Sequence, residues 1–151
     1  ANAVTWVQIP AFALFLIKRV NITMAHMKTK IGEYAIITNS KNEFLMLEML
    51  GEDRGWHFPG GRLDKGEEAV HGLLREVKEE TNLEITDIKP VFCKIFTREN
   101  KYGVWFTAKV KEPYKVKLDH EHENFKWFKI EDIDSIDFWQ DFYCQMLKDN
   151  L

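Results

Sequence analysis

The stretch that decides the fold is GGRLDKGEEAVHGLLREVKEETNLEI, residues 60–85. It opens with paired glycines, which mark a turn. Its apolar residues then recur at helical spacing, at Val70, Leu73, Leu74 and Val77. This spacing predicts a helix over residues 67–81. Asn82 follows, and asparagine tolerates the left-handed backbone with which many helices end.

The segments on both sides of this stretch predict strands and a second helix. Apolar runs bounded by turn residues predict strands at 32–39, 43–50, 56–58, 85–99, 102–112 and 123–130. Phe138, Phe142 and Met146 repeat every fourth residue, which predicts an amphipathic helix over 138–150. Because the strands lie among helices in the sequence, we expect an α/β fold with a sheet covered on both faces.

Length, charge and cysteine content narrow the class of protein. A chain of 151 residues fits one domain with a substantial core. The net charge is −3 and the isoelectric point about 6.0, so no general basic field would recruit nucleic acid. Cys93 and Cys144 form no CxxC pattern. This usage predicts a reduced, cytoplasmic protein with two buried thiols.

The first part of the chain contains an apolar run, VTWVQIPAFALFLIKRV. Gln8 and Pro10 interrupt this run, and its cations follow the apolar residues instead of preceding them. A signal peptide has its positive charge first, and a spanning helix needs about 20 apolar residues. MAHM at 24–27 is typical of a cloning junction. We therefore expect residues 1–26 to be a cloning-derived or non-catalytic extension, and 27–151 to be the functional domain.

The predicted central helix is unusually acidic along one face. Glu76, Glu79 and Glu80 have the spacing that brings side chains together on a helix. Like charges at this spacing repel each other by a few tenths of a kcal/mol. A hard divalent cation would remove that cost, because it takes carboxylate oxygens as ligands. The alternative, from the helix alone, is a solvated face whose charges interact with Arg75 and Lys78.

The residues around these glutamates carry a family resemblance. The pattern runs through Gly61, Glu67, Arg75, Glu76, Val77, Glu79, Glu80, Asn82 and Leu83. It resembles the Nudix box, GX5EX7REUXEEXGU, in which U is a bulky aliphatic residue. Asn82 replaces the last glycine, a mild departure because asparagine also supplies a left-handed backbone. Residues 56–61 and 121–133 look like the family's flanking segments, so the likeness covers 28–151, although only the box is specific.

The resemblance implies both a fold and a reaction. The fold would be an α/β/α sandwich in which a mixed sheet lies between the box helix and a C-terminal helix. Nudix enzymes hydrolyse a nucleoside diphosphate linked to another group, by attack of water on phosphorus, with Mg²⁺ or Mn²⁺ bound at the box. We therefore expect a metal-dependent pyrophosphohydrolase that is inert without a divalent ion. Its expected partner is a small-molecule nucleotide, with no nucleic acid and no membrane, and a homodimer is allowed.

The resemblance also assigns metal ligands. Glu79 and Glu80 would be the principal ligands. Glu76 would be a third ligand, or the group that orients or deprotonates the attacking water. Glu67 would support the metals directly or through water. The carbonyl of Gly60 would be a further ligand, because it belongs to a glycine turn that exposes backbone oxygen.

Other residues are expected to support or complete the site. Arg75 would hold the glutamates by charge-assisted hydrogen bonds, and Gly61 would let the chain approach the metal without a side chain. Many relatives use one more glutamate from outside the box, for which the candidates are Asp119, Glu121 and Glu123. We favour Glu121. Alternation along an extended segment would place these three acids on one side, with His120 and His122 on the other.

Substrate contacts are the least determined part of the sequence. Arg54, Arg62 and Lys65 lie in loops from which they could approach phosphate, although solvated surface charge is the alternative for each. Aromatic residues that could stack on a base are Trp56, Phe58, Trp105 and Trp127, with core packing as the alternative. Candidate substrates include nucleoside triphosphates, ADP-ribose-like sugars, GDP-sugars and dinucleoside polyphosphates. The segment WHFPGGRLDKGE favours triphosphates or nucleotide sugars.

Two alternatives to this enzyme, and one alternative interpretation of the histidine pair, remain open. The first is a non-catalytic Nudix-fold domain that binds a nucleotide or regulates a partner. The intact set of Glu76, Glu79, Glu80 and Arg75 argues against it, because a binder has no need for all four. The second is a membrane-tethered protein that uses residues 1–23. The third is a zinc site at His120 and His122, although these two residues lack further Cys or His ligands nearby. Glu68 and Glu84 fall outside the pattern and are interpreted as surface charges.

Overall fold

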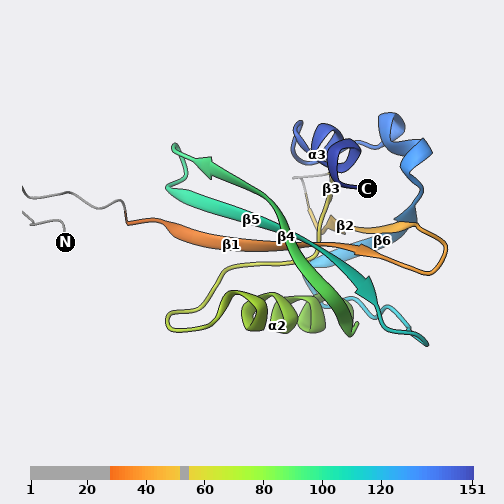
Figure 1. The fold of residues 1–151 in the computed structure, drawn as a ribbon, viewed down its shortest axis with the longest axis horizontal. Coiled ribbons are helices and arrows are strands. Elements are labelled where there is room, and N and C mark those ends of the chain that lie inside the picture. The colour runs from red at the N-terminus through yellow and green to blue at the C-terminus, as the bar shows by residue number, and fades with distance from the viewer. Residues whose placement is uncertain (1–27, 52–54) are drawn as a thin grey trace, which may run out of the picture.

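The computed structural model of the chain describes residues 28–51 and 55–151 (Figure 1). Its elements are β1 (Lys30–Thr38), β2 (Phe44–Met49), β3 (Trp56–His57), α2 (Ala69–Thr81), β4 (Ile85–Phe96), β5 (Lys101–Val110), β6 (His122–Phe128), the 3-10 helix η1 (Ile130–Ser135) and α3 (Tyr143–Asn150). The predicted extension at residues 1–26 lies outside the described part of the chain. The strands form one six-stranded sheet in the order β3-β2-β1-β5-β4, and β6 pairs with β2.

The sheet is mixed, as predicted. β1 and β5 run parallel through its centre, while the other strand pairs are antiparallel. The glycine turn after β3 continues alongside β1. The N–H of Ala35 donates to the Pro59 carbonyl at 2.8 Å. The N–H of Glu33 donates to the Gly61 carbonyl at 2.9 Å. The backbone of the turn is therefore fixed to a central strand.

α2 and α3 lie on opposite sides of the sheet (Figure 1). The core on the α2 side is mostly aliphatic and includes Ala35, Ile37, Leu45, Leu47, Leu73, Val77 and Leu83. The core on the α3 side is rich in aromatic residues and includes Tyr34, Phe44, Phe58, Trp105, Phe128 and Tyr143. Alternate residues of β1 serve the two cores, because successive side chains of a strand point to opposite faces.

The ends of α2 are set by local backbone chemistry. The helix begins at Ala69 instead of residue 67, because Gly66 has φ +86° and the N–H of Glu67 closes a turn onto the Asp64 carbonyl at 3.1 Å. At its other end Asn82 has φ 59° and ψ 15°, and its N–H donates to the Lys78 carbonyl. The predicted left-handed stop at Asn82 is confirmed.

The C-terminal helix is shorter than the sequence predicts. α3 begins at Tyr143, whereas the apolar spacing predicted a start at residue 138. The reason is a long-range backbone contact with β3. The N–H of Trp56 donates to the Asp137 carbonyl at 2.8 Å, and the N–H of Trp139 donates to the Trp56 carbonyl at 3.0 Å. These bonds hold Phe138 in a strand-like bridge, so the helix cannot include it.

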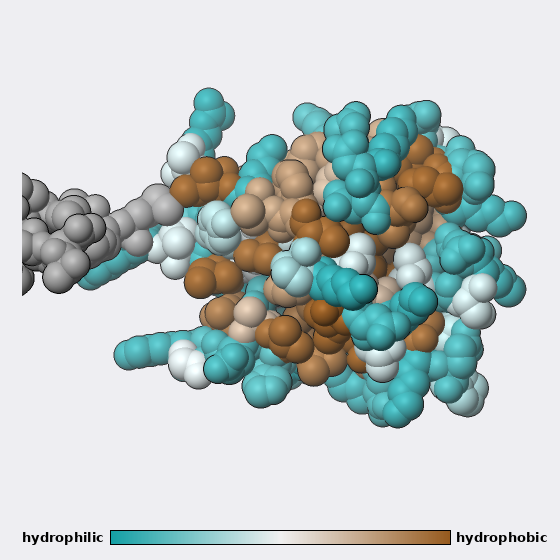
Figure 2. Space-filling view, in the orientation of Figure 1, coloured by the Kyte–Doolittle hydropathy of each residue, from teal (hydrophilic) through white to brown (hydrophobic). Residues whose placement is uncertain are grey.

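Two surface features complete the description. Figure 2 shows hydrophilic side chains around the rim of the visible face and apolar ones nearer its centre. Cys93 is exposed and Cys144 is half-buried, and both are free, so the prediction of two buried thiols was wrong. Within residues 28–51 and 55–151, none of the helices has the length and apolar character needed to cross a bilayer.

Candidate active site

Arg75 on α2 links three box glutamates. Its Nε and Nη2 atoms donate to the two carboxylate oxygens of Glu67, at 3.0 and 2.9 Å. Its Nη1 atom donates to Glu76 at 2.9 Å and lies 3.5 Å from a carboxylate oxygen of Glu79. These bonds from Arg75, with one from the Asp64 N–H, lower the pKa of Glu67. Arg75 therefore fixes the positions of carboxylates that would otherwise repel each other.

Glu80 is the most enclosed of the box glutamates on α2. Its side chain is buried, and one oxygen accepts the N–H of Gly60 at 2.8 Å. Burial raises the pKa of Glu80 to about 8. The Gly60 bond opposes this rise, and the nearby charges of Glu76, Asp119 and Glu121 add to it. A buried carboxylate with so little compensation is the kind of group that a cation would stabilise.

The two glycines of the turn let the backbone approach these acids. Gly60 has φ +138°, which other residues rarely adopt. Its carbonyl accepts no hydrogen bond from the described residues, whereas the carbonyls of Pro59 and Gly61 both do. A side chain at Gly61 would occupy the place of the Glu76 carboxylate. The turn therefore leaves one carbonyl oxygen free and brings Glu76 against the backbone.

A loop from outside the box closes the acidic face of α2. The N–H of Asp119 donates to the Glu80 carbonyl at 3.3 Å. The resulting cavity has a volume of about 360 Å³. It is lined by Glu76, Glu79, Glu80, Asp119, His120 and Glu121. The structure thus brings Glu121 to the box glutamates, whereas Glu123 is exposed on β6 and does not line this cavity.

The predicted alternation across 119–123 was wrong. The backbone bends at residues 120 and 121 before β6 begins. As a result His120 lines the cavity beside Glu121, and Asp119 turns to His122, with 2.7 Å between Oδ1 and Nδ1. The alternation rule applies only to extended backbone, and the bend breaks it.

Two buried imidazoles lie behind the cavity. The rings of His57 and His122 stack with centroids 5.1 Å apart, and Nε2 of His122 lies 3.9 Å from a carboxylate oxygen of Glu80. Burial, with a smaller contribution from His122, lowers the pKa of His57 to about 4. His57 is therefore neutral at ordinary pH. Within the described residues, no three His, Cys, Asp or Glu side chains form a ready-made metal cage, which gives the zinc alternative no support.

The donor chemistry of the cavity fits a hard cation that is completed by other ligands. Mg²⁺ uses a few carboxylates, keeps several waters and bridges to substrate phosphate, so a closed cage of side chains is not required. The cavity offers the carboxylates of Glu76, Glu79 and Glu80, and the free carbonyl of Gly60 lies next to the Gly60 N–H that holds Glu80. These oxygens belong to four of the five predicted metal ligands. The fifth, Glu67, does not line this cavity, and metal binding by all five stays a prediction.

Glu33 is a residue of this region that the motif did not reveal. It lies on β1 and is 1% exposed, and neither carboxylate oxygen has a hydrogen-bond partner among the described residues. Burial and the charge of Glu67 raise its pKa to about 7, although Arg75 opposes the rise. The sequence held one signal. Glu33 precedes Ala35 and Ile37 at alternate positions, so a strand places it on the same core face.

The predicted substrate residues are not gathered in one place. Arg54 lies outside the described residues. Arg62 and Lys65 are exposed and line a separate cavity of about 360 Å³ that also includes Glu67. Phe58 is fully buried, with its ring centroid 4.8 Å from that of Tyr143. It belongs to the core and cannot stack on a base without leaving it.

The other aromatic candidates also pack against protein. Trp56 is half-buried and meets the ring of Phe128 edge-on at 5.0 Å. Trp105 is buried in the α3-side core. Trp127 is half-buried, with its ring centroid 5.3 Å from that of Tyr114. These four aromatic side chains therefore give no support to the prediction that one of them stacks on a base.

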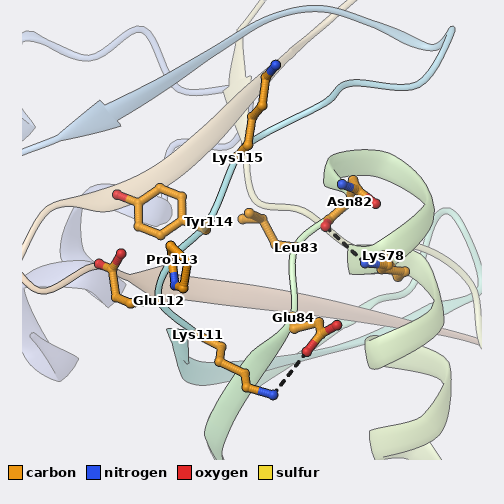
Figure 3. Close-up of a pocket in the computed structure, with 9 residues that line it drawn as sticks. All are labelled: Lys78, Asn82, Leu83, Glu84, Lys111, Glu112, Pro113, Tyr114 and Lys115. Atoms are coloured by element: carbon orange, nitrogen blue, oxygen red, sulfur yellow. Dashed lines mark hydrogen bonds and ion pairs between the residues drawn. The ribbon is translucent and has the colours of Figure 1, made fainter.

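A further cavity lies at the C-terminal end of α2, with a volume of about 260 Å³ (Figure 3). Several lysines line it, which invites comparison with a phosphate site. Figure 3 shows Lys78 directed at the Asn82 carbonyl, 3.1 Å away, and Lys111 directed at the Glu84 carboxylate, 3.3 Å away. These two charges are already engaged on the cavity wall.

Comparison with known proteins defines the class. The model of the NUDIX domain matches residues 28–147, so the chain belongs to the Nudix family. A bis(5′-nucleosyl)-tetraphosphatase (asymmetrical) of Caenorhabditis elegans is 32% identical over 99 residues, which cover 61% of this chain and 71% of that protein. A protein of the same name from Mus musculus is 30% identical over 103 residues, covering 62% and 69%.

Solved structures agree with this assignment. A C. elegans Ap4A hydrolase in a binary complex has a TM-score of 0.64 at 28% identity, over 78% of this chain and 93% of that one. The MutT protein of Methanosarcina mazei Go1 has a TM-score of 0.65 at 26% identity, over 82% and 94%. The predicted Nudix fold is confirmed, and the chain is a pyrophosphohydrolase of this family.

Proposed function

We propose that this chain is a Mg²⁺- or Mn²⁺-dependent hydrolase that cleaves one phosphoanhydride bond of a dinucleoside polyphosphate, with a tetraphosphate bridge preferred. The sequence favoured nucleoside triphosphates or nucleotide sugars. The relatives from worm and mouse, both named bis(5′-nucleosyl)-tetraphosphatase (asymmetrical), support the dinucleoside substrate instead. A triphosphate or nucleotide sugar is the alternative against which the proposal is tested.

The observation that carries the proposal is the cavity shared by the box helix and the loop at residues 119–121. Glu79, Glu80 and the Gly60 carbonyl would hold the cations. Glu67 would support them from the Arg75 cluster, which consists of Arg75 and the carboxylates of Glu67, Glu76 and Glu79. When bound, divalent cations neutralise phosphate charge and lower the pKa of a coordinated water. Without them the acidic cavity would repel a polyphosphate, and activity would be absent.

The chain's own residues divide the remaining work. In the proposed reaction the water oxygen bonds to one phosphorus, the bridging P–O bond breaks, and the bridging oxygen leaves on the rest of the phosphate chain. One water proton passes to a carboxylate, for which Glu76 and Glu121 are the candidates. Arg75 would keep Glu76 in place, since it donates to that carboxylate at 2.9 Å. The products of asymmetrical cleavage are a nucleoside monophosphate and a nucleoside triphosphate.

A substrate panel tests the proposal. The full chain is incubated with Mg²⁺ and a dinucleoside tetraphosphate, a nucleoside triphosphate or a nucleotide sugar, and products are separated by anion-exchange chromatography. We expect equal amounts of monophosphate and triphosphate from the dinucleotide, and no reaction after chelation. Two diphosphates, or faster release of pyrophosphate from a triphosphate, would overturn the substrate assignment. Turnover that survives exhaustive chelation would overturn the metal assignment.

We also propose that residues 27–151 are the catalytic domain and that 1–26 are dispensable. The family match begins at residue 28, which supports this division. A chain that starts at Met27 should keep its kcat/KM for the preferred substrate. Loss of activity in a truncated but folded chain would contradict the division.

A further inference from the structure

Glu33 and Gly72 lie against each other, and each of them is expected to lower the stability of the fold. An unpaired carboxylate inside a protein is costly, because burial removes its water without replacing it. A glycine within a helix costs about 1 kcal/mol relative to alanine. A Cβ atom built on Gly72 would lie 2.5 Å from Oε2 of Glu33. The helix therefore has a glycine where the buried carboxylate needs the space.

The same position is close to the Arg75 cluster. The Cβ position at Gly72 is 3.1 Å from Oε2 of Glu67, so the carboxylates of Glu33 and Glu67 are separated by no more than the sum of these two short distances. The Glu76 carboxylate lies against Gly61, the residue whose carbonyl accepts the Glu33 N–H. The carboxylates of Glu33 and Glu67 thus meet at Gly72, and that of Glu76 lies at the neighbouring glycine turn.

Arg75 does not satisfy all three of them. Its donors go to Glu67, Glu76 and the carbonyl of Arg62, while both oxygens of Glu33 remain without a donor among the described residues. The missing partner is therefore one that takes carboxylate oxygens as ligands, and a positive charge on it would compensate the ionised form of Glu33. A divalent cation has this chemistry.

We propose that Glu33 is a further carboxylate of the metal site, which binds a divalent cation together with Glu67 and Glu76 on the side of α2 that faces β1. The proposal rests on the metal dependence in the proposed function and adds a ligand that lies outside the box. It assigns a reason to both Glu33 and Gly72. A purely structural carboxyl group at this place would need no cation.

Mn²⁺ binding to the full chain tests the proposal without substrate. Free Mn²⁺ is followed by electron paramagnetic resonance during a titration of wild type, Glu33→Gln and Glu99→Gln. Glu99 is exposed in the turn between β4 and β5, so its variant matches the charge change away from the site. We expect Glu33→Gln to lose one bound ion or about tenfold or more in affinity. Glu99→Gln should match wild type.

A second variant guards against misfolding of the first. Gly72→Ala should move the Glu33 carboxylate and weaken Mn²⁺ binding in the same direction, with Glu33 itself unchanged. Thermal unfolding without metal is measured for each chain, because a structural role alone would change the melting temperature and leave the Mn²⁺ titration as in wild type. Unchanged Mn²⁺ affinity and stoichiometry in a folded Glu33→Gln chain, or in Gly72→Ala if the first does not fold, overturns the proposal.

The outcomes separate this inference from the proposed function. A wild-type chain that binds no Mn²⁺ overturns both. If Glu33→Gln binds Mn²⁺ as tightly as the wild-type chain does, only the role of Glu33 is overturned. A clear loss in Glu33→Gln supports the inference even if the substrate panel shows a different nucleotide.

Discussion

The two faces of the sheet are packed with different side chains. On the α3 side, large aromatic residues such as Phe44, Trp105 and Tyr143 fill the core. On the α2 side, smaller aliphatic residues pack under the helix, and carboxylates occupy its edge and part of its underside. One side of the molecule is thus built from apolar contact, and the other includes charges that protein groups only partly compensate.

This difference suggests a division of roles, in which the α3 side stabilises the fold and the α2 side holds the proposed reactive groups. The aromatic side supplies buried area that stabilises the fold. The acidic side holds Glu80 and Glu33 with raised pKa values, an arrangement that weakens the metal-free protein and is typical of functional sites. Mutations on the two sides should therefore separate activity from stability, and the following predictions test that separation.

The largest effect is expected from the paired change of Glu79→Gln with Glu80→Gln. It removes the two principal proposed metal ligands, so turnover of the preferred substrate should fall by roughly three orders of magnitude or more. The melting temperature without metal should not fall, because a glutamine oxygen at position 80 can still accept the Gly60 N–H and the amide carries no charge that burial would penalise. Steady-state kinetics and circular dichroism measure both quantities. Turnover near the level of a Glu68→Gln control would contradict the division between the faces.

On the opposite face, Trp105→Ala should act on stability. The side chain is buried among Tyr34, Phe92 and Tyr143, so its removal leaves a cavity and costs about 3–5 kcal/mol of unfolding free energy. Urea denaturation gives this value. The folded chain should bind Mn²⁺ as tightly as wild type. Reduced nucleotide affinity without reduced stability would instead return Trp105 to the list of base-stacking residues.

Arg75→Lys should have an intermediate effect on the acidic face. Lysine keeps the charge but cannot make the paired bonds that Arg75 makes to Glu67, so the carboxylates lose their fixed geometry. We expect activity to fall about tenfold to a hundredfold. Measuring kcat/KM against Mg²⁺ concentration shows whether added metal recovers part of the loss. A fully active variant would mean that the cluster is not needed to position Glu76.

The pH dependence of the metal-free protein provides a further test. Folded Glu80 keeps its proton up to about pH 8, whereas the unfolded carboxyl group loses it near pH 4.5. The folded state therefore binds more protons, and stability should fall as the pH rises from 6.5 to 8. His57 opposes this decline near pH 6.5, because its unfolded imidazole is still partly protonated there, whereas the raised pKa of Glu33 adds to the decline up to about pH 7. Melting temperatures should show the decline most clearly between pH 7 and 8, and saturating Mg²⁺ or Glu80→Gln should reduce it there.

The smallest effect is expected at Asn82, the residue that ends α2. Glycine adopts the left-handed backbone more readily, so Asn82→Gly should stabilise the chain by no more than about 1 kcal/mol. Activity should not change, because the residue ends the helix and does not line the acidic cavity. A large loss of activity would show that the asparagine side chain has a role beyond the helix end.

Features that depend on local sequence were predictable. The box helix, its stop at Asn82 and the grouping of Glu76, Glu79 and Glu80 follow from spacing along one helix. Features set by distant contacts were not. The start of α3 depends on the backbone of Trp56, and the direction of His120 depends on a bend beside α2. Glu33 comes close to Glu67 because β1 lies beside the glycine turn, a register that no motif encodes.

The hydrogen bonds between β1 and the glycine turn also determine how the protein opens. The amides of Glu33 and Ala35 donate to the turn, so their exchange with solvent deuterium reports on the turn as well as on the strand. β1 pairs with β5 along its whole length. The backbone of the turn should therefore belong to the slowest-exchanging cooperative unit, while the loop at 119–121 opens at lower free energy. The Gly60 carbonyl, a proposed metal ligand, would then leave its position only when the whole domain unfolds.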